Sequence, residues 1–261
     1  MEKIDNLVVI IMAGGLGKRM NSTLPKVLHP INGTPMICKI IDQAQLLNPD
    51  KIFIIVGKYK TIIEETIKNN NNHNNIQYII QEEALGTGHA LLCCRDELLK
   101  LPSHNVLILS GDVPLISSET MRNICSEQNS IVVTSLDDPS GYGRIIENSN
   151  NEFQKIVEEK DCNDDERSVK KVNCGIYYIT SCNLCEYLPQ IKNNNSQGEY
   201  YLTDIIEIIK NNSNHTINTI QIPKDKQHEI MGVNTAEQLQ DLQQRTHGSP
   251  AENYVFRTFP C

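Results

Sequence analysis

The stretch IMAGGLGKRMNSTLPKVL, residues 11–28, closes the first apolar run of the chain. The apolar run at 7–12 predicts a buried strand, and the glycines that follow predict a loop leaving its carboxyl end. Glycines in such a loop let backbone N–H groups crowd around phosphate oxygens, and Arg19 and Lys26 add positive charge just beyond them. The stretch therefore predicts an anion-binding site at the end of the first strand.

Along the first half of the chain, nearly continuous apolar runs alternate with segments that have the periodicity of a helix. Strands are predicted at 7–12, 51–57, 76–80 and 105–112, and helices at 35–47, 61–69 and 89–100. After about residue 130 most segments have the apolar pattern of strands, namely IVVTSLDD, YGRIIEN, FQKIVEEKD and KKVNCGIYYIT. Two more helices are predicted, within 200–211 and 235–245. We expect an α/β fold with a Rossmann-like, mixed but mainly parallel sheet and helices on both faces. Residues 1–246 would form one domain, followed by a tail at 247–261.

The composition restricts the class of protein. The chain has 261 residues, 39% of them hydrophobic and 21% charged, with a net charge of −8. That charge argues against non-specific binding to nucleic acid or to an anionic membrane, and no apolar run approaches the ~20 residues of a membrane helix. The nine cysteines show no paired metal-ligand spacing, and the single CxxC at 182–185 is interpreted as part of a helix. We expect a cytoplasmic protein with reduced thiols.

Residues 11–28 match neither of two well-known phosphate-binding motifs. A P-loop would need glycine at Met12 and Ser or Thr at Arg19, and the dinucleotide fingerprint would need glycine at Met20. What remains is a glycine loop followed by an arginine, which can grip phosphate through two hydrogen bonds, and a lysine, which acts as a point charge.

The pattern A-G-G-x-G-x-R-M followed by L-P-K-V-L-H resembles the sugar-phosphate nucleotidyltransferases, most closely the uridyltransferase domain of the bacterial N-acetylglucosamine-1-phosphate uridyltransferases. The likeness covers residues 7 to about 245, with the motifs in the family's order. They are QEEALGTGHA (81–90), GDVPLIS (111–117), DDPSGYGRI (137–145), KIVEEKDC (155–162), VNCGIY (172–177), NNNSQGEYYLTDII (193–206) and GVN (232–234).

The resemblance implies transfer of a uridylyl group from UTP to N-acetylglucosamine 1-phosphate, with release of pyrophosphate. Arg19 and Lys26 would then be the catalytic cations, because holding and neutralising two anionic reactants is most of the catalysis. Asp112 and Asn234 would hold Mg²⁺, although an Asp after a strand and an Asn before a helix are also ordinary capping residues.

The resemblance also divides the chain into a mainly nucleotide-binding part, 1–115, and a mainly sugar-binding part, 116–246. His89 is interpreted as a packing residue at a helix start rather than an acid or base. The nucleotide would contact Ala13, Gly14, Gly15, Gln81, Gly86 and Thr87, with the Gln81 amide suited to a uracil edge. The sugar would contact Gly143, Glu158, Asn173, Tyr201 and Thr203.

Departures from the family's pattern leave alternatives open. Met12, Lys18, Ser110 and Cys174 replace residues more usual in the family, which puts the sugar and base preference in doubt. One alternative is a nucleotidyltransferase that uses another sugar 1-phosphate or another nucleotide. The other is a non-catalytic protein that binds nucleotide sugars. A glycosyltransferase would usually show a DxD motif where this chain has SGDV. No hexapeptide repeat follows residue 246, so we expect no acetyltransferase activity.

Overall fold

The computed structural model describes residues 3–15, 17–20, 22–70, 73–212 and 216–247. Its strands are β1 Leu7–Met12, β2 Pro30–Ile31, β3 Thr34–Pro35, β4 Lys51–Val56, β5 Ile76–Ile80, β6 Asn105–Ser110, β7 Ser130–Ser135, β8 Arg144–Glu147, β9 Phe153–Val157, β10 Lys171–Thr180 and β11 Asn218–Gln221. Its α-helices are α1 Met36–Gln45, α2 Lys60–Asn70, α3 Thr87–Leu92, α4 Arg95–Leu98, α5 Ser118–Ile124, α6 Asp164–Arg167, α7 Ser181–Tyr187, α8 Asp204–Asn212 and α9 Ala236–His247. Short 3₁₀ helices are η1 Lys18–Met20, η2 Lys26–Leu28, η3 Glu159–Asp161, η4 Leu188–Gln190 and η5 Lys224–Ile230.

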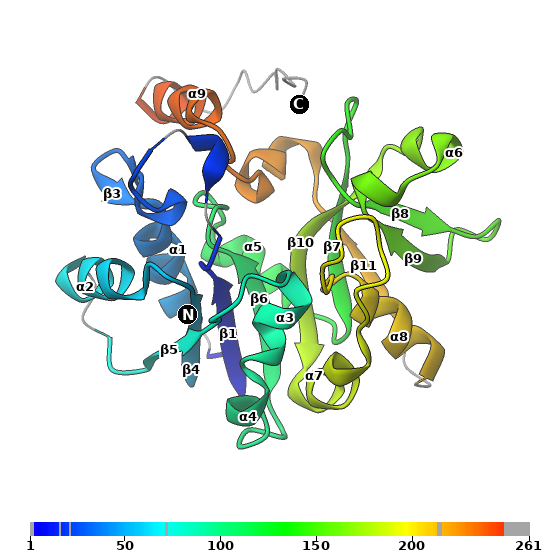
Figure 1. The fold of residues 1–261 in the computed structure, drawn as a ribbon, viewed down its shortest axis with the longest axis horizontal. Coiled ribbons are helices and arrows are strands. Elements are labelled where there is room, and N and C mark those ends of the chain that lie inside the picture. Colours follow the sequence, from blue (N-terminus) through cyan, green and yellow to red (C-terminus); the bar gives the residue numbers. More distant parts are fainter. Residues whose placement is uncertain (1–2, 16, 21, 71–72, 213–215, 248–261) are drawn as a thin grey trace.

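One mixed sheet runs through the molecule (Figure 1). Its main path is β11-β7-β10-β6-β1-β4-β5, and the β8–β9 hairpin joins it through β10. Strands β6, β1, β4 and β5 are parallel neighbours, whereas β10 lies antiparallel to both β6 and β7. The expected mixed, mainly parallel α/β sheet is confirmed, and the carboxyl ends of β1, β4, β5 and β6 share one edge.

Helices cover both faces of the sheet, as the continuous apolar strands predict. On one face, alternate residues of β1 such as Val9 and Ile11 pack with α1, α2 and α5. On the other, Val8 and Ile10 pack with α3, α4, α7 and α8. Alternation along a strand sends successive side chains to opposite faces, so a strand buried on both sides must be apolar throughout. Among the helices described, none combines the length and apolar character needed to cross a membrane.

One predicted helix is corrected in detail. The single helix expected at 89–100 is two helices, α3 and α4, separated at Cys93 and Cys94. The Cys94 N–H donates to the carbonyl of Leu91, three residues back, which tightens the chain and ends the α-helical pattern. The helix expected within 200–211 is present as α8, which begins at Asp204, after the crossing contacts of Tyr200. The CxxC at 182–185 lies within α7, as expected, and of the tail only His247 is described.

A crossing contact joins the two halves of the chain. The Tyr200 N–H donates to the Leu85 carbonyl and the Gly88 N–H donates to the Tyr200 carbonyl, at 2.8 and 2.7 Å. Gly86 has φ of +113°, and a Cβ there would lie 2.5 Å from the Tyr200 carbonyl oxygen. Glycine is therefore required at 86, and the contact brings segment 199–203 beside the loop that follows β5.

Candidate active site

Four side chains from distant segments meet at the carboxyl edge of the sheet. The Lys26 ammonium bonds to Oδ2 of Asp112 and lies 3.1 Å from Oδ1 of Asn234. The exposed Arg19 donates from Nη2 to the same Asn234 oxygen, at 3.1 Å. Lys26 and Asp112 are mostly buried, with side-chain exposures of 15% and 14%. Two cations thus converge on one carboxylate and one amide.

Glycines bring these segments close together. Gly17 adopts φ of +58°, and a Cβ there would lie only 2.8 Å from Cβ of Lys26. Gly111, the residue after β6, lies very close to the end of β1. A Cβ at this position would lie 2.8 Å from the Met12 carbonyl oxygen. The Val233 N–H donates to the Asp112 carbonyl, which ties the segment carrying Asn234 to the same edge.

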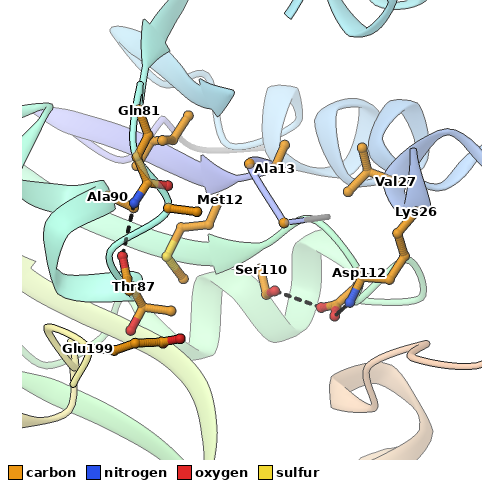
Figure 2. A pocket seen from close by; sticks show the side chains of 15 residues that line it. Met12, Ala13, Lys26, Val27, Gln81, Thr87, Ala90, Ser110, Asp112 and Glu199 are labelled. Atoms are coloured by element: carbon orange, nitrogen blue, oxygen red, sulfur yellow. Dashed lines mark hydrogen bonds and ion pairs between the residues drawn. The ribbon is translucent and has the colours of Figure 1, made fainter. Parts of the chain in front are cut away.

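A cleft of ≈ 830 Å³ opens between the glycine loop and the loop that follows β5, and we call it the glycine-loop cleft. Lys26 and Asp112 point toward one another at one end, and Gln81 lies at the other (Figure 2). Six of its lining residues are Ala13, Gly14, Gly15, Gln81, Gly86 and Thr87. Glycine backbone beside a lysine is a suitable lining for polyphosphate.

A second cleft of ≈ 780 Å³, the β8–β10 cleft, lies beside the first. Met12, Thr87, Ser110 and Asp112 line both clefts, so the acid–lysine cluster stands at their junction. Gly143, Glu158, Asn173, Thr203 and Asn234 line the second cleft.

Hydrogen bonds fix the polar groups of the β8–β10 cleft. Thr203 donates to Oε1 of Glu158 at 2.9 Å, and the Asn173 amide donates to the Tyr177 hydroxyl at 2.7 Å. Gly143 packs closely on β9, since a Cβ there would lie 3.0 Å from Cγ2 of Ile156. Burial raises the pKa of Glu158, the nearby Asp161 charge raises it further, and the Thr203 hydrogen bond lowers it. These groups offer fixed donors and acceptors to a polyhydroxylated ligand.

An ion pair between a buried arginine and a partly exposed glutamate holds the rim of this cleft. The Arg144 guanidinium, 2% exposed, lies 2.7 Å from Oε2 of Glu159 and also bonds to the Tyr142 carbonyl. The same Glu159 oxygen accepts from the Gly141 N–H at 3.1 Å. The pair therefore anchors loop 141–143 to the segment that carries Glu158.

The donor set at the junction fits Mg²⁺. The Lys26 ammonium already places a cation where a carboxylate oxygen of Asp112 and the amide oxygen of Asn234 converge. Mg²⁺ takes hard oxygen ligands and commonly only one or two protein side chains, with phosphates and waters completing the shell. Nowhere in the described ranges do three or more His, Cys, Asp or Glu side chains form a metal-holding group.

Comparison with known proteins decides the family, since the sequence profile described as nucleotidyl transferase matches residues 8–225. The chain belongs to the nucleotidyl transferase family. It is a nucleotidyltransferase enzyme.

This nucleotidyl transferase has curated relatives of moderate identity. It is 44% identical over 243 residues to a "Probable UDP-N-acetylglucosamine pyrophosphorylase" of Acanthamoeba polyphaga mimivirus, covering 91% of this chain and 95% of that protein. It is 41% identical over 240 residues to a "Bifunctional protein GlmU" of Clostridium botulinum (strain Loch Maree / Type A3), covering 90% of this chain but 50% of the relative. The chain therefore spans about half the length of that bifunctional relative.

A solved structure shows the same fold. The crystal structure of UDP-glucose pyrophosphorylase complexed with UDP-glucose aligns with a TM-score of 0.71 and 18% identity. The alignment covers 95% of this chain and 99% of that one.

The structure brings most of the predicted site residues of this nucleotidyl transferase together. The six expected around the nucleotide line the glycine-loop cleft, and four of the five expected around the sugar line the β8–β10 cleft. Tyr201 is the exception, since it is buried, lines neither cleft, and its hydroxyl accepts a hydrogen bond from Nε2 of Gln197 at 2.9 Å. Arg19 also lies outside both linings but reaches the junction through Asn234.

Three contacts were not predicted. Glu199 lines the glycine-loop cleft, two positions before Tyr201 in the same motif. Ser110 donates to Oδ1 of Asp112 at 2.6 Å and lines both clefts. His89 contacts the Gln81 amide rather than serving only for packing. The family motif around Glu199 indicated that this segment belongs to the site. It could not predict which of its residues faces the cleft, because that depends on the unusual path of the backbone.

Proposed function

We propose that this nucleotidyl transferase transfers a uridylyl group from UTP to N-acetylglucosamine 1-phosphate. The observation that carries the proposal is the meeting of Lys26 with Asp112 and Asn234 at the junction of the two clefts. A triphosphate in one cleft and a sugar phosphate in the other would have their reacting phosphates at this junction. The named product is supported by the mimivirus relative, whose name gives a UDP-N-acetylglucosamine pyrophosphorylase and which covers 91% of this chain.

In the reaction, an oxygen of the sugar phosphate attacks the α-phosphorus of UTP. A phosphorus–oxygen bond forms there, the bond to the β-phosphate oxygen breaks, and pyrophosphate leaves with the electron pair. No covalent intermediate with the protein is needed, so catalysis depends on positioning and on neutralising negative charge.

Lys26 would exchange its carboxylate partner for phosphate oxygens near the reacting centre. Arg19, exposed at the mouth of the site, would bind the departing pyrophosphate through its planar guanidinium. Backbone N–H groups around Gly14 and Gly15 would meet the phosphates in the glycine-loop cleft. Asp112 and Asn234 would hold Mg²⁺, which when bound supplies charge neutralisation and orientation to the phosphates.

The β8–β10 cleft would select the sugar. Glu158, oriented by Thr203, would accept hydrogen bonds from sugar hydroxyls, and the Asn173 amide would meet the acetamido group. Tyr201 would act from outside this lining by keeping segment 199–203 in place.

Pyrophosphate release by the purified chain with Mg²⁺ tests the proposal. UTP is compared with the other nucleoside triphosphates, and N-acetylglucosamine 1-phosphate with glucose 1-phosphate. We expect release only with UTP and the acetamido sugar, and its loss when the metal is chelated. Release with glucose 1-phosphate or another nucleotide would keep the mechanism and refute the named substrates.

A further inference from the structure

Glu158 and Glu159 are neighbours in the chain but make different contacts. Glu158 lines the β8–β10 cleft, whereas Glu159 lines neither cleft and faces the Arg144 guanidinium, with its Oε2 at 2.7 Å from Nη2. Arg144 also lines neither cleft, and its Nε has no hydrogen-bond partner among the residues described. The pair can therefore affect a ligand only through the groups that it holds.

The pair holds loop 141–143, and all three residues of this loop line the β8–β10 cleft. Arg144 donates from Nη1 to the Tyr142 carbonyl, and Oε2 of Glu159 accepts from the Gly141 N–H at 3.1 Å. One carboxylate oxygen thus takes hydrogen bonds from both the guanidinium and the loop backbone. Without the pair, the first two residues of the loop would lose a shared anchor.

The other end of the loop passes beside the Glu158 carboxylate. A Cβ on Gly143 would lie 3.5 Å from Oε2 of Glu158, an ordinary contact distance. The Gly143 carbonyl accepts from the Asn173 N–H at 2.8 Å, and Thr203 donates to the other carboxylate oxygen of Glu158. The loop backbone and the Glu158 carboxylate therefore lie together in the lining, and a ligand in contact with both needs them at a fixed spacing.

We propose that Glu159 is a positioning residue for sugar binding, which holds loop 141–143 beside Glu158 through Arg144 and the Gly141 N–H. The inference rests on the proposed function, in which the β8–β10 cleft takes the sugar phosphate. A preformed wall spares the ligand the cost of ordering it, so loss of the anchor weakens binding of the sugar. The glycine-loop cleft has no part in these contacts, and binding of the nucleotide should be unaffected.

The test variant replaces both partners, Arg144→Met together with Glu159→Leu. Removing Glu159 alone would leave a buried guanidinium unpaired and destabilise the whole fold, whereas replacing a buried pair by apolar side chains is often neutral. KM for the sugar phosphate should rise about tenfold. KM for UTP should change less than about twofold and kcat less than about threefold, which a general loss of structure would not produce.

Two further variants separate positioning from packing. Glu159→Gln keeps an oxygen acceptor for the Gly141 N–H, so its KM for the sugar phosphate should stay within about threefold of wild type. Glu159→Asp keeps the charge but is one methylene shorter. It replaces the double variant if that protein fails to fold, and it should raise the same KM more than Glu159→Gln does.

Lys171→Met together with Glu147→Leu is the matched control. Lys171 lies 2.5 Å from Oε1 of Glu147, so this change removes an ion pair that joins β8 and β10 away from loop 141–143. KM for the sugar phosphate should stay within about twofold of wild type in this control.

Hydrogen exchange of loop 141–143 gives a readout that needs no substrate. Its amides should exchange faster in the Arg144→Met, Glu159→Leu protein than in the wild type or the control. Equal exchange, an unchanged KM for the sugar phosphate, or an equal rise in KM for UTP or in the control would each overturn the inference. Failure of the proposed function is distinguishable, since the wild type would then turn over no sugar phosphate while the difference in exchange remained.

Discussion

The two clefts share an edge of the sheet but are built in different ways. The glycine-loop cleft is formed where β1, β5 and β6 end, and its lining includes the backbone of Gly14, Gly15 and Gly86. The β8–β10 cleft is formed by antiparallel strands and by segment 199–203, and its polar groups are held by side-chain hydrogen bonds and the Arg144–Glu159 pair. The first cleft depends on the course of the backbone, the second on particular side chains.

This difference separates two kinds of mutational effect. Changes at the junction should abolish the reaction, because the charges there serve every substrate of this type. Changes in the β8–β10 cleft should alter the sugar that is accepted while the nucleotide is still bound. The predictions below test that separation, beginning with the largest expected effect.

Asp112→Ala should lower kcat/KM by about 10²–10³, as expected for a lost electrostatic group at a reacting centre. The substitution removes the carboxylate that bonds to Lys26 and the oxygen proposed for the metal. Steady-state pyrophosphate release measures the effect. The control is Asp137→Ala, whose carboxylate is 97% exposed, and it should retain wild-type activity. Activity of Asp112→Ala within about threefold of wild type would remove Asp112 from the mechanism.

Glu158→Gln should raise KM for the sugar phosphate about 10- to 30-fold, because a neutral amide accepts weaker hydrogen bonds than a carboxylate. KM for the nucleotide should change less than about twofold if the two clefts act separately. Initial-rate kinetics with each substrate varied in turn give both constants. Glu152→Gln, on the exposed end of the β8–β9 hairpin, is the control. Equal changes in both KM values would contradict the separation.

Lys26→Met should strengthen metal binding in the absence of nucleotide, about tenfold, because a cation no longer occupies the oxygens of Asp112 and Asn234. The same variant should lose most activity, since the phosphates lose their lysine. Mn²⁺ titration followed by electron paramagnetic resonance measures the dissociation constant directly. An unchanged constant would mean that the lysine and the metal do not compete for these oxygens.

Asp204→Asn should stabilise the protein at neutral pH. Burial raises the pKa of Asp204 from 3.8 to about 6, and the charges of Glu158, Glu207 and Asp161 add to this. The folded state therefore favours the protonated acid. This contribution to stability is complete below pH 3.8 and is lost as the pH rises through about 6. Because the group is partly exposed, we expect the variant to gain only about 1 kcal/mol above pH ~7.

Urea unfolding at neutral and at acidic pH measures this effect. The free energies of unfolding of the variant and the wild type should converge below pH ~4, where the wild-type acid is protonated in both states. A constant difference at every pH would contradict the electrostatic cause.

Sequence reasoning located the parallel half of the fold because each of its strands is apolar on both faces. It recovered β1, β4, β5 and β6 within two residues at each end. It did not identify α5, whose two turns are too short for a helical period and which depends on the Ser117 cap. Residues such as Gly14 and Gln81 could be placed because they follow strands that share an edge. Tyr201 and Glu199 could not, because their orientation depends on a crossing contact with Leu85 and Gly88.

The separation of the junction residues along the chain has a consequence for synthesis. Lys26 and Asn234 are 208 residues apart, and Arg19 and Asn234 are 215 apart. A ribosome makes Lys26 208 residues before Asn234, so the cluster of Lys26, Asp112 and Asn234 stays incomplete until the GVN segment has been made. The parallel strands β1, β4, β5 and β6 can pair earlier, but the growing polypeptide gains all the groups proposed to bind phosphate and metal only just before α9 is made.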